Sequence, residues 1–183
     1  SGITIIQPIN VPAVGTYPLI TVTGTLGGSA ANFQVNALTT RNRSYSIVYD
    51  TVSSPKRVLL QVSSAGSAAN LTWVGDSVNN LWDITTSSDW LNGASSDVYY
   101  DADNVNFTDV GASNQPVLNV TVNPGSVNFN STSNYTLIGT GAIAGQAVVS
   151  KGGTGTVTLS TTNTYSGGTI ITNGVLKLGA AQA

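Results

Sequence analysis

The sequence predicts an all-β protein built as a parallel β-solenoid. No window of the chain shows the i, i+3, i+4, i+7 apolar spacing of an amphipathic helix. Short runs of β-branched and aliphatic residues recur between Gly, Asn, Pro and Ser, as strands separated by turns do. Residues 153–179 then contain three short strands, Thr156–Ser160, Thr169–Thr172 and Val175–Leu178, joined by turns too short for a crossover helix. Strands this short gain stability when each pairs with its equivalent in the next coil.

Residues 1–65 contain several predicted strands. In the run from Tyr45 to Val52, Tyr45 and Ile47 lie on one face, because side chains alternate along a strand. A turn at residues 53–56 leads to the next strand, so this pair fits either an antiparallel hairpin near residues 45–62 or two successive coils. The clearest strands of this part are Thr4–Gln7, Tyr17–Thr25, Tyr45–Val52 and Val58–Val62.

Residues 66–183 form the second part, after the small and polar stretch Ser64–Ala69. Its predicted strands include Leu71–Trp73, Val105–Phe107, Val127–Phe129 and Tyr135–Ile138. Stacked parallel coils place like residues above one another, so we expect ladders of Asn and Thr side chains. The positions that we expect to face inward are Val157, Leu159, Ile171, Leu176 and Leu178, with Tyr45, Ile47, Phe107 and Leu137 earlier in the chain.

Three runs near the C-terminus carry a resemblance to a known family. Residues 155–159 (GTVTL), 163–169 (NTYSGGT) and 173–179 (NGVLKLG) resemble the passenger-associated transport repeat, also called the autotransporter-associated β-strand repeat. The resemblance implies a right-handed parallel β-helix in large secreted or surface-attached bacterial proteins, without catalytic residues or cofactors.

A weaker resemblance extends over the rest of the chain. Leu71–Trp90 and Asp101–Phe107 resemble the head of long repeat units in such proteins, and Gly15–Ile20, Tyr45–Tyr49 and Val58–Val62 resemble the tail. We therefore interpret residues 1–65 as the C-terminal coils of one repeat unit. Residues 66–183 are then the start of the next unit, with the repeat motif at 153–179.

Composition narrows the classes of partner. The 183 residues are 40% hydrophobic but only 8% charged, with a net charge of −2. Nucleic acid is not an expected partner, because its backbone selects clustered basic residues. We interpret the basic spots Arg41–Arg43 and Lys56–Arg57 as solvated turns. The chain has no Cys for disulfides, and no apolar run reaches the ~18 residues of a membrane span. Since Ser1 is not Met, we expect that it is not the translation start.

Clustered aspartates are the first candidate site. Asp101 and Asp103, with Asn104, offer hard oxygen ligands of the kind calcium prefers. The usual calcium loops are missing, so capping of turns is the favoured interpretation. The same Asp pair could supply the acid and base of a polysaccharide-active β-helix. The chain has neither His nor Glu for such chemistry, and we expect no enzyme.

Aromatic residues are the second candidate site. Trp offers a large flat face with a polar edge, so Trp82, Trp90, Tyr99 and Tyr100 could contact glycans. That hypothesis describes an adhesin module. The competing interpretation places Trp73, Trp82 and Trp90 in a small core, and this is the one that we favour.

The two chain ends give the leading hypothesis. Both are rich in strands, and uncapped strands leave unpaired backbone groups that invite pairing. We expect an axial interface in which the C-terminal coil of one copy, or of one repeat, docks on the N-terminal coil of the next. The residues assigned to it are Thr4, Ile5 and Ile6 at one end and Val175, Leu176 and Leu178 at the other. The function expected is that of a structural repeat unit of an extracellular or surface-displayed bacterial protein, able to form filaments.

Overall fold

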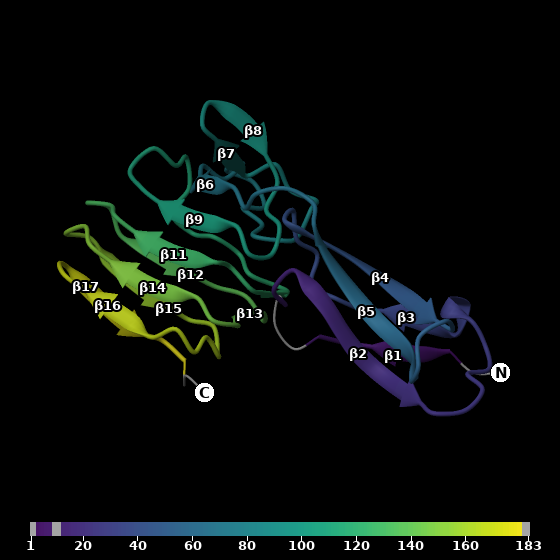
Figure 1. Cartoon of the computed structure of the whole chain (residues 1–183). Coiled ribbons are helices and arrows are strands. Elements are labelled where there is room, and N and C mark those ends of the chain that lie inside the picture. Colours follow the sequence, from purple (N-terminus) through teal and green to yellow (C-terminus); the bar gives the residue numbers. More distant parts are fainter. Residues whose placement is uncertain (1–2, 9–11, 181–183) are drawn as a thin grey trace. The chain divides into compact units, whose positions relative to one another are not determined.

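A computed structural model describes residues 3–8 and 12–180, and in these residues the chain is all-β apart from one 3₁₀ turn, η1 (Ala30–Asn32) (Figure 1). The chain divides into two compact units. The first comprises residues 1–38 and 42–67, and the second comprises 39–41 and 68–183. No helix in the described ranges is long and apolar enough to cross a membrane.

The first unit contains two small sheets. Strand β1 (Thr4–Ile6) pairs in parallel with β3 (Phe33–Val35). The other sheet is antiparallel and has the order β2 (Gly15–Val22), β5 (Lys56–Ser64), β4 (Arg43–Asp50). Its β4–β5 pair confirms the hairpin alternative for residues 45–62.

Burial in the antiparallel sheet follows the alternation of the strands. Val58, Leu60 and Val62 form the buried face of the central strand β5. Tyr45 and Ile47, predicted to face inward, are half-buried, whereas Ser46 between them is exposed. These two residues belong to the outer strand β4, which has a neighbour in the sheet on one side among the described strands.

The second unit is a β-solenoid of about three turns. One face is formed by five parallel strands, β6 (Asn70–Trp73), β9 (Asn104–Phe107), β11 (Ser126–Phe129), β14 (Val148–Lys151) and β16 (Thr169–Ile171). A second face holds β12 (Tyr135–Leu137), β15 (Thr156–Leu159) and β17 (Val175–Leu178). A third pairs β10 (Thr121–Val122) with β13 (Ala142–Ile143). Figure 1 shows the coils stacked one on another from β6, through β9, β11 and β14, to β16.

Inward residues of successive coils form apolar columns. In one column Leu71, Val105, Val127 and Val149 are register partners, and all are 0% exposed. In the next, Phe107 and Phe129 stack with ring centroids 4.6 Å apart. The predicted inward residues Val157, Leu159, Phe107 and Leu137 are confirmed as buried.

Outward residues form the expected polar ladders. Asn104 donates to Asn70 at 3.0 Å, and the Ser126 hydroxyl donates to Asn104 at 2.9 Å. Asn128 donates to Asn106 at 3.3 Å. These bonds link coil to coil, in line with the predicted amide and hydroxyl ladders, and they add to the backbone ladder that fixes the register.

The N-terminal end of the solenoid is closed. Strands β7 (Trp90–Asn92) and β8 (Ser95–Asp97) continue the large sheet beyond β6 as an antiparallel hairpin. Thr40 adds a parallel bridge to Asp101, whose N–H donates to the Thr39 carbonyl at 2.9 Å. A coil therefore cannot be added at β6 without displacing these segments.

Candidate functional site: the open end of the solenoid

The C-terminal end of the solenoid is open. Strand β16 is the last strand of its sheet and pairs with β14, and β17 is the last strand of its sheet and pairs with β15. In the described part of the chain no further strand pairs with either of them. Both strands therefore present backbone N–H and C=O groups that another strand could bind.

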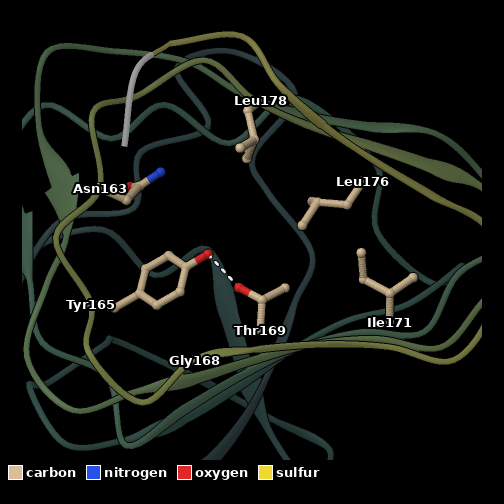
Figure 2. Close-up of a pocket in the computed structure, with 7 residues that line it drawn as sticks. All are labelled: Asn163, Tyr165, Gly168, Thr169, Ile171, Leu176 and Leu178. Carbon is tan, nitrogen blue, oxygen red and sulfur yellow. Dashed lines mark hydrogen bonds between the residues drawn. The ribbon is translucent and has the colours of Figure 1, made fainter. Parts of the chain in front are cut away.

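A cavity of about 480 Å³ lies between these two strands. Figure 2 shows that side chains from both strands converge on it. Ile171 is 53% exposed and Leu178 is 59% exposed, although both occupy inward positions of the coil. The lining residues are Asn163, Tyr165, Gly168, Thr169, Ile171, Leu176 and Leu178.

Ile171, Leu176 and Leu178, which were predicted to face inward, all line the cavity, where Ile171 and Leu178 are exposed and Leu176 is half-buried. They stand in the same columns as residues that are fully buried one coil earlier: Leu178 partners Leu159, and Leu176 partners Val157. Their exposure arises because no described coil covers them. The open end is thus an unfinished continuation of the core.

Polar groups fix the corner of the last coil. The buried Asn163 accepts the Ile143 N–H at 2.9 Å and donates to the Thr161 carbonyl at 2.9 Å. The hydroxyls of Tyr165 and Thr169 are 2.9 Å apart and form a hydrogen bond at one side of the cavity (Figure 2). The polar side chains on the cavity wall are therefore Asn163 and the Tyr165–Thr169 pair, and its other lining side chains are apolar.

Lys151 lies one coil below the cavity, in register with Ile171. Its side chain is 1% exposed and its Nζ donates to the carbonyls of Gly153 and Asn173. Burial lowers the pKa of Lys151, because the charged form loses its hydration. Lys151 was not among the predicted inward residues, although its spacing of two from the inward Val149 puts it on the same face of β14.

The aspartates predicted as a calcium or acid–base site are bound by protein donors. Asp103 accepts the Ala69 N–H at 2.8 Å through one oxygen, and the Tyr100 N–H at 3.0 Å and the Arg41 guanidinium at 2.8 Å through the other. Asp101 accepts the Asn123 N–H at 2.7 Å. Burial raises the pKa of Asp101, against the hydrogen bonds that stabilise its charged form. Asn104 belongs to the amide ladder, and in the described ranges no cluster of three His, Cys, Asp or Glu residues could hold a metal ion.

The prediction that aromatic side chains form a glycan site is wrong for three of the four residues, because these three are buried. Trp82, Trp90 and Tyr99 are each 0% exposed and pack edge to face or tilted, with ring centroids 5.5–6.1 Å apart. A sugar cannot reach these faces, so the core interpretation holds for them. Tyr100 is partly exposed, with the Arg41 guanidinium 4.4 Å from its ring centroid.

Arg41 was interpreted as part of a solvated turn, and the structure corrects this. Its guanidinium bridges Asp103 at 2.8 Å and Asp97 at 3.2 Å. The cluster ties residues 39–41 to the closed end of the solenoid. Arg41, Asp97 and Asp103 thus form a structural clamp. This clamp lies at the first coil of the solenoid, whereas the cavity lies at the last.

Comparison with known proteins identifies one segment. The family model of the passenger-associated-transport-repeat matches residues 149–178, which run from β14 to β17 and include the cavity walls. A search of curated proteins and one of solved structures found no significant match. The repeat indicates a passenger domain of an autotransporter-like protein. The match covers the open end of the solenoid, and residues 149–178 are thus similar to a passenger-associated transport repeat.

Proposed function

We propose that the chain is a structural segment of a secreted or surface-displayed, autotransporter-like passenger, and that it extends by axial stacking of β-coils without enzymatic activity. The observation that carries the proposal is the open last coil. It combines two strand edges that have no partner among the described strands with a largely apolar cavity of about 480 Å³. Repeat proteins of this kind need either a cap or a neighbour at each end.

The chemistry of the open end favours a polypeptide coil as its occupant. A lipid or other apolar small molecule would fill the space but leave the strand edges unpaired. A β-coil satisfies both, since its backbone pairs with β16 and β17 and its side chains cover Ile171 and Leu178. Adjacent repeats of one long chain and separate copies of the chain both meet this description.

The test is assembly of the purified chain. We expect light scattering to rise with protein concentration and electron microscopy to show filaments. Leu178→Lys places a charge in the cavity wall and should abolish assembly. Val52→Lys is the matched control, because Val52 is 94% exposed in the turn between β4 and β5 and belongs to neither β16 nor β17. Assembly that Leu178→Lys leaves unchanged, or a wild-type chain that stays monomeric at all concentrations, would overturn the axial-stacking proposal.

A further inference from the structure

We propose that β16 of one copy pairs in parallel with β1 of a second copy, with Ile170 opposite Ile5. This inference rests on the proposed axial stacking and names its partner strand. It commits the open end to a second copy of this chain. Three independent features of the two strands support it.

The first feature is sequence identity. Strand β1 is Thr-Ile-Ile (residues 4–6), and β16 is also Thr-Ile-Ile (residues 169–171). The likeness extends outward, since residues 1–6 (SGITII) and 166–171 (SGGTII) agree at five of six positions. A strand with the sequence of the last rung is suited to the next rung, because stacked coils place like residues above one another.

The second feature is the phase of the hydrogen bonds. On β16, Gly168 and Thr172 bond to β14, since Val149 donates to the Gly168 carbonyl and Thr172 donates to the Lys151 carbonyl. Alternate residues of a parallel strand face opposite neighbours, so the N–H and C=O groups of Thr169 and Ile171 face the open edge.

The edge of β1 has the complementary phase. Asn36 donates to the Ile6 carbonyl at 2.8 Å, so Ile6 bonds to β3. The backbone groups of Ile5 then face the other edge, where no described strand pairs with β1. With Ile5 opposite Ile170, its N–H reaches the Thr169 carbonyl and its C=O accepts from Ile171. A shift by one residue breaks this match.

The third feature is the continuity of the faces. Thr169 and Ile171 point into the cavity (Figure 2), and Ile170 between them is 54% exposed. In the proposed register Ile6 lies over Ile171, and Val35, its partner on β3, extends the same column. Ile5 and Gln34, both exposed, continue the outward column of Ile170. The established coil-to-coil interface thus continues through the second copy.

Such a contact joins different surfaces of the two copies. A head-to-tail interface of this kind adds copies without limit unless its rotation closes a ring. At the other end of the solenoid the hairpin of β7 and β8 covers β6, so β6 does not offer a free parallel edge for a further coil. Growth is therefore directed, with β1 of each incoming copy seated on the β16 edge of the previous one.

Cysteine cross-linking tests the register, because the chain has no native Cys. Neighbouring strands lie about 4.8 Å apart, which is within the roughly 4.4–6.8 Å that a disulfide spans between Cα atoms. The double variant Ile5→Cys/Ile170→Cys should form a ladder of covalent oligomers on oxidation. A mixture of the two single variants should give one cross-linked heterodimer band and little else. Both positions are exposed, so the fold is preserved, and circular dichroism verifies this.

Two controls define the outcomes. Ile3→Cys/Ile170→Cys tests a register two residues away, and Ile5→Cys/Lys177→Cys tests β17 as the partner strand. Cross-linking of either control at the rate expected for Ile5→Cys/Ile170→Cys would overturn this pairing. Filaments without the Ile5–Ile170 cross-link would refute the pairing and leave axial stacking intact. Absence of any assembly would refute both.

Discussion

Lys151 takes the place above Phe129 in an inward column of the solenoid: the two residues are register partners in neighbouring strands. The column runs from Phe107 through Phe129 to Lys151 and then Ile171. A lysine therefore stands where the preceding coils have aromatic rings. Its Nζ reaches past the core to the carbonyls of Gly153 and Asn173, and so ties the turn of the last coil to the coil below.

This position makes stability depend on pH through Lys151. Because burial lowers the pKa of the folded-state amine, the unfolded chain binds more protons in the alkaline range, and stability contributed by this group rises with pH. We expect wild type to gain stability relative to Lys151→Met as the pH rises toward the ~10.4 of a free lysine. Thermal unfolding of both proteins at pH 7 and pH 10 measures the difference.

Lys177→Met is the matched control, since Lys177 is exposed on β17. Its stability relative to wild type should keep the same value across this range. If the difference in melting temperature between Lys151→Met and wild type is the same at pH 7 and pH 10, the buried position does not disfavour the charged amine.

Local patterns predicted the strands and the columns because both follow from alternation within four or five residues. Val157 and Leu159 illustrate this, since each is buried where its spacing placed it. Lys151 was missed for a related reason. A charged residue in an alternating strand is ordinarily placed in solvent, and only the contact with the Asn173 carbonyl one coil later explains its burial.

Non-local partners lie beyond the reach of such patterns. Arg41 and Asp103 are 62 residues apart and form a hydrogen bond at 2.8 Å. Nothing in the residues around Arg41 distinguishes it from Arg43. Likewise, the spacings of nine and eight between the three Trp do not by themselves show how the rings pack. The hairpin of β7 and β8 brings Trp90 against Trp73.

The Arg41 clamp is expected to stabilise the closed end of the solenoid. Asp103 is fully buried, and removing the guanidinium from a buried ion pair leaves an uncompensated charge. Arg41→Met should lower the free energy of unfolding by about 3 kcal/mol. Arg41→Lys should recover part of this loss, because an ammonium cannot match the fork geometry that binds two carboxylates. Chemical denaturation measures both variants.

The double variant Arg41→Met/Asp103→Asn provides the control. With the carboxylate neutralised, the loss from Arg41→Met should shrink, and the cycle yields the coupling between the two residues. Additive losses in this cycle would show that Arg41 acts through its packing on Tyr100 and not through Asp103.

Trp82 is expected to stabilise the fold through its packing in the core. Its side chain is 0% exposed and packs against Trp90, Tyr99 and Phe107. Trp82→Ala should lower the free energy of unfolding by about 3–5 kcal/mol. Trp82→Phe should cost much less, because among the described residues the indole Nε1 has no hydrogen-bond partner to lose. Equal losses for the two variants would point to a polar role for the indole.

Asp109 is expected to make the stability of the fold depend on pH in the acidic range. Its carboxylate accepts bonds from the Ser131 hydroxyl and from the N–H groups of Thr132 and Ser133. The Ser131 hydroxyl is the main cause, followed by the two N–H groups, and together they hold the pKa of Asp109 well below its usual range. Stability from a depressed carboxyl pKa is present above the unfolded value of about 3.9 and is lost as the pH falls below it.

The measurement is thermal unfolding of wild type and Asp109→Asn. We expect the variant to melt at a lower temperature at pH 7, and the gap to narrow steadily from pH 4 to pH 2. Asp50→Asn should show a pH dependence of the same sign, because hydrogen bonds from Ser53 and Val52 also lower the pKa of Asp50. A gap for Asp109→Asn that is constant with pH would contradict the assignment.

Gly139 is expected to mark a close approach of two coils. It has φ +118°, and a Cβ at this position would overlap the carbonyl of Leu118 in the preceding coil. The backbone there is fixed, since Leu118 donates to the Ile138 carbonyl and Gly141 donates to the Leu118 carbonyl, both at 2.7 Å. Gly139→Ala must therefore push the coils apart as well as strain the turn.

Gly93→Ala separates these two effects. Gly93 also has a positive φ, +63°, but a Cβ there would meet nothing within 4 Å. We expect Gly93→Ala to cost about 1 kcal/mol from the left-handed backbone alone. Gly139→Ala should cost about 1–3 kcal/mol more from overpacking. Equal losses would mean that the coils yield easily, and the tight axial spacing would then come from the hydrogen-bond ladder and not from the small residues at the corner.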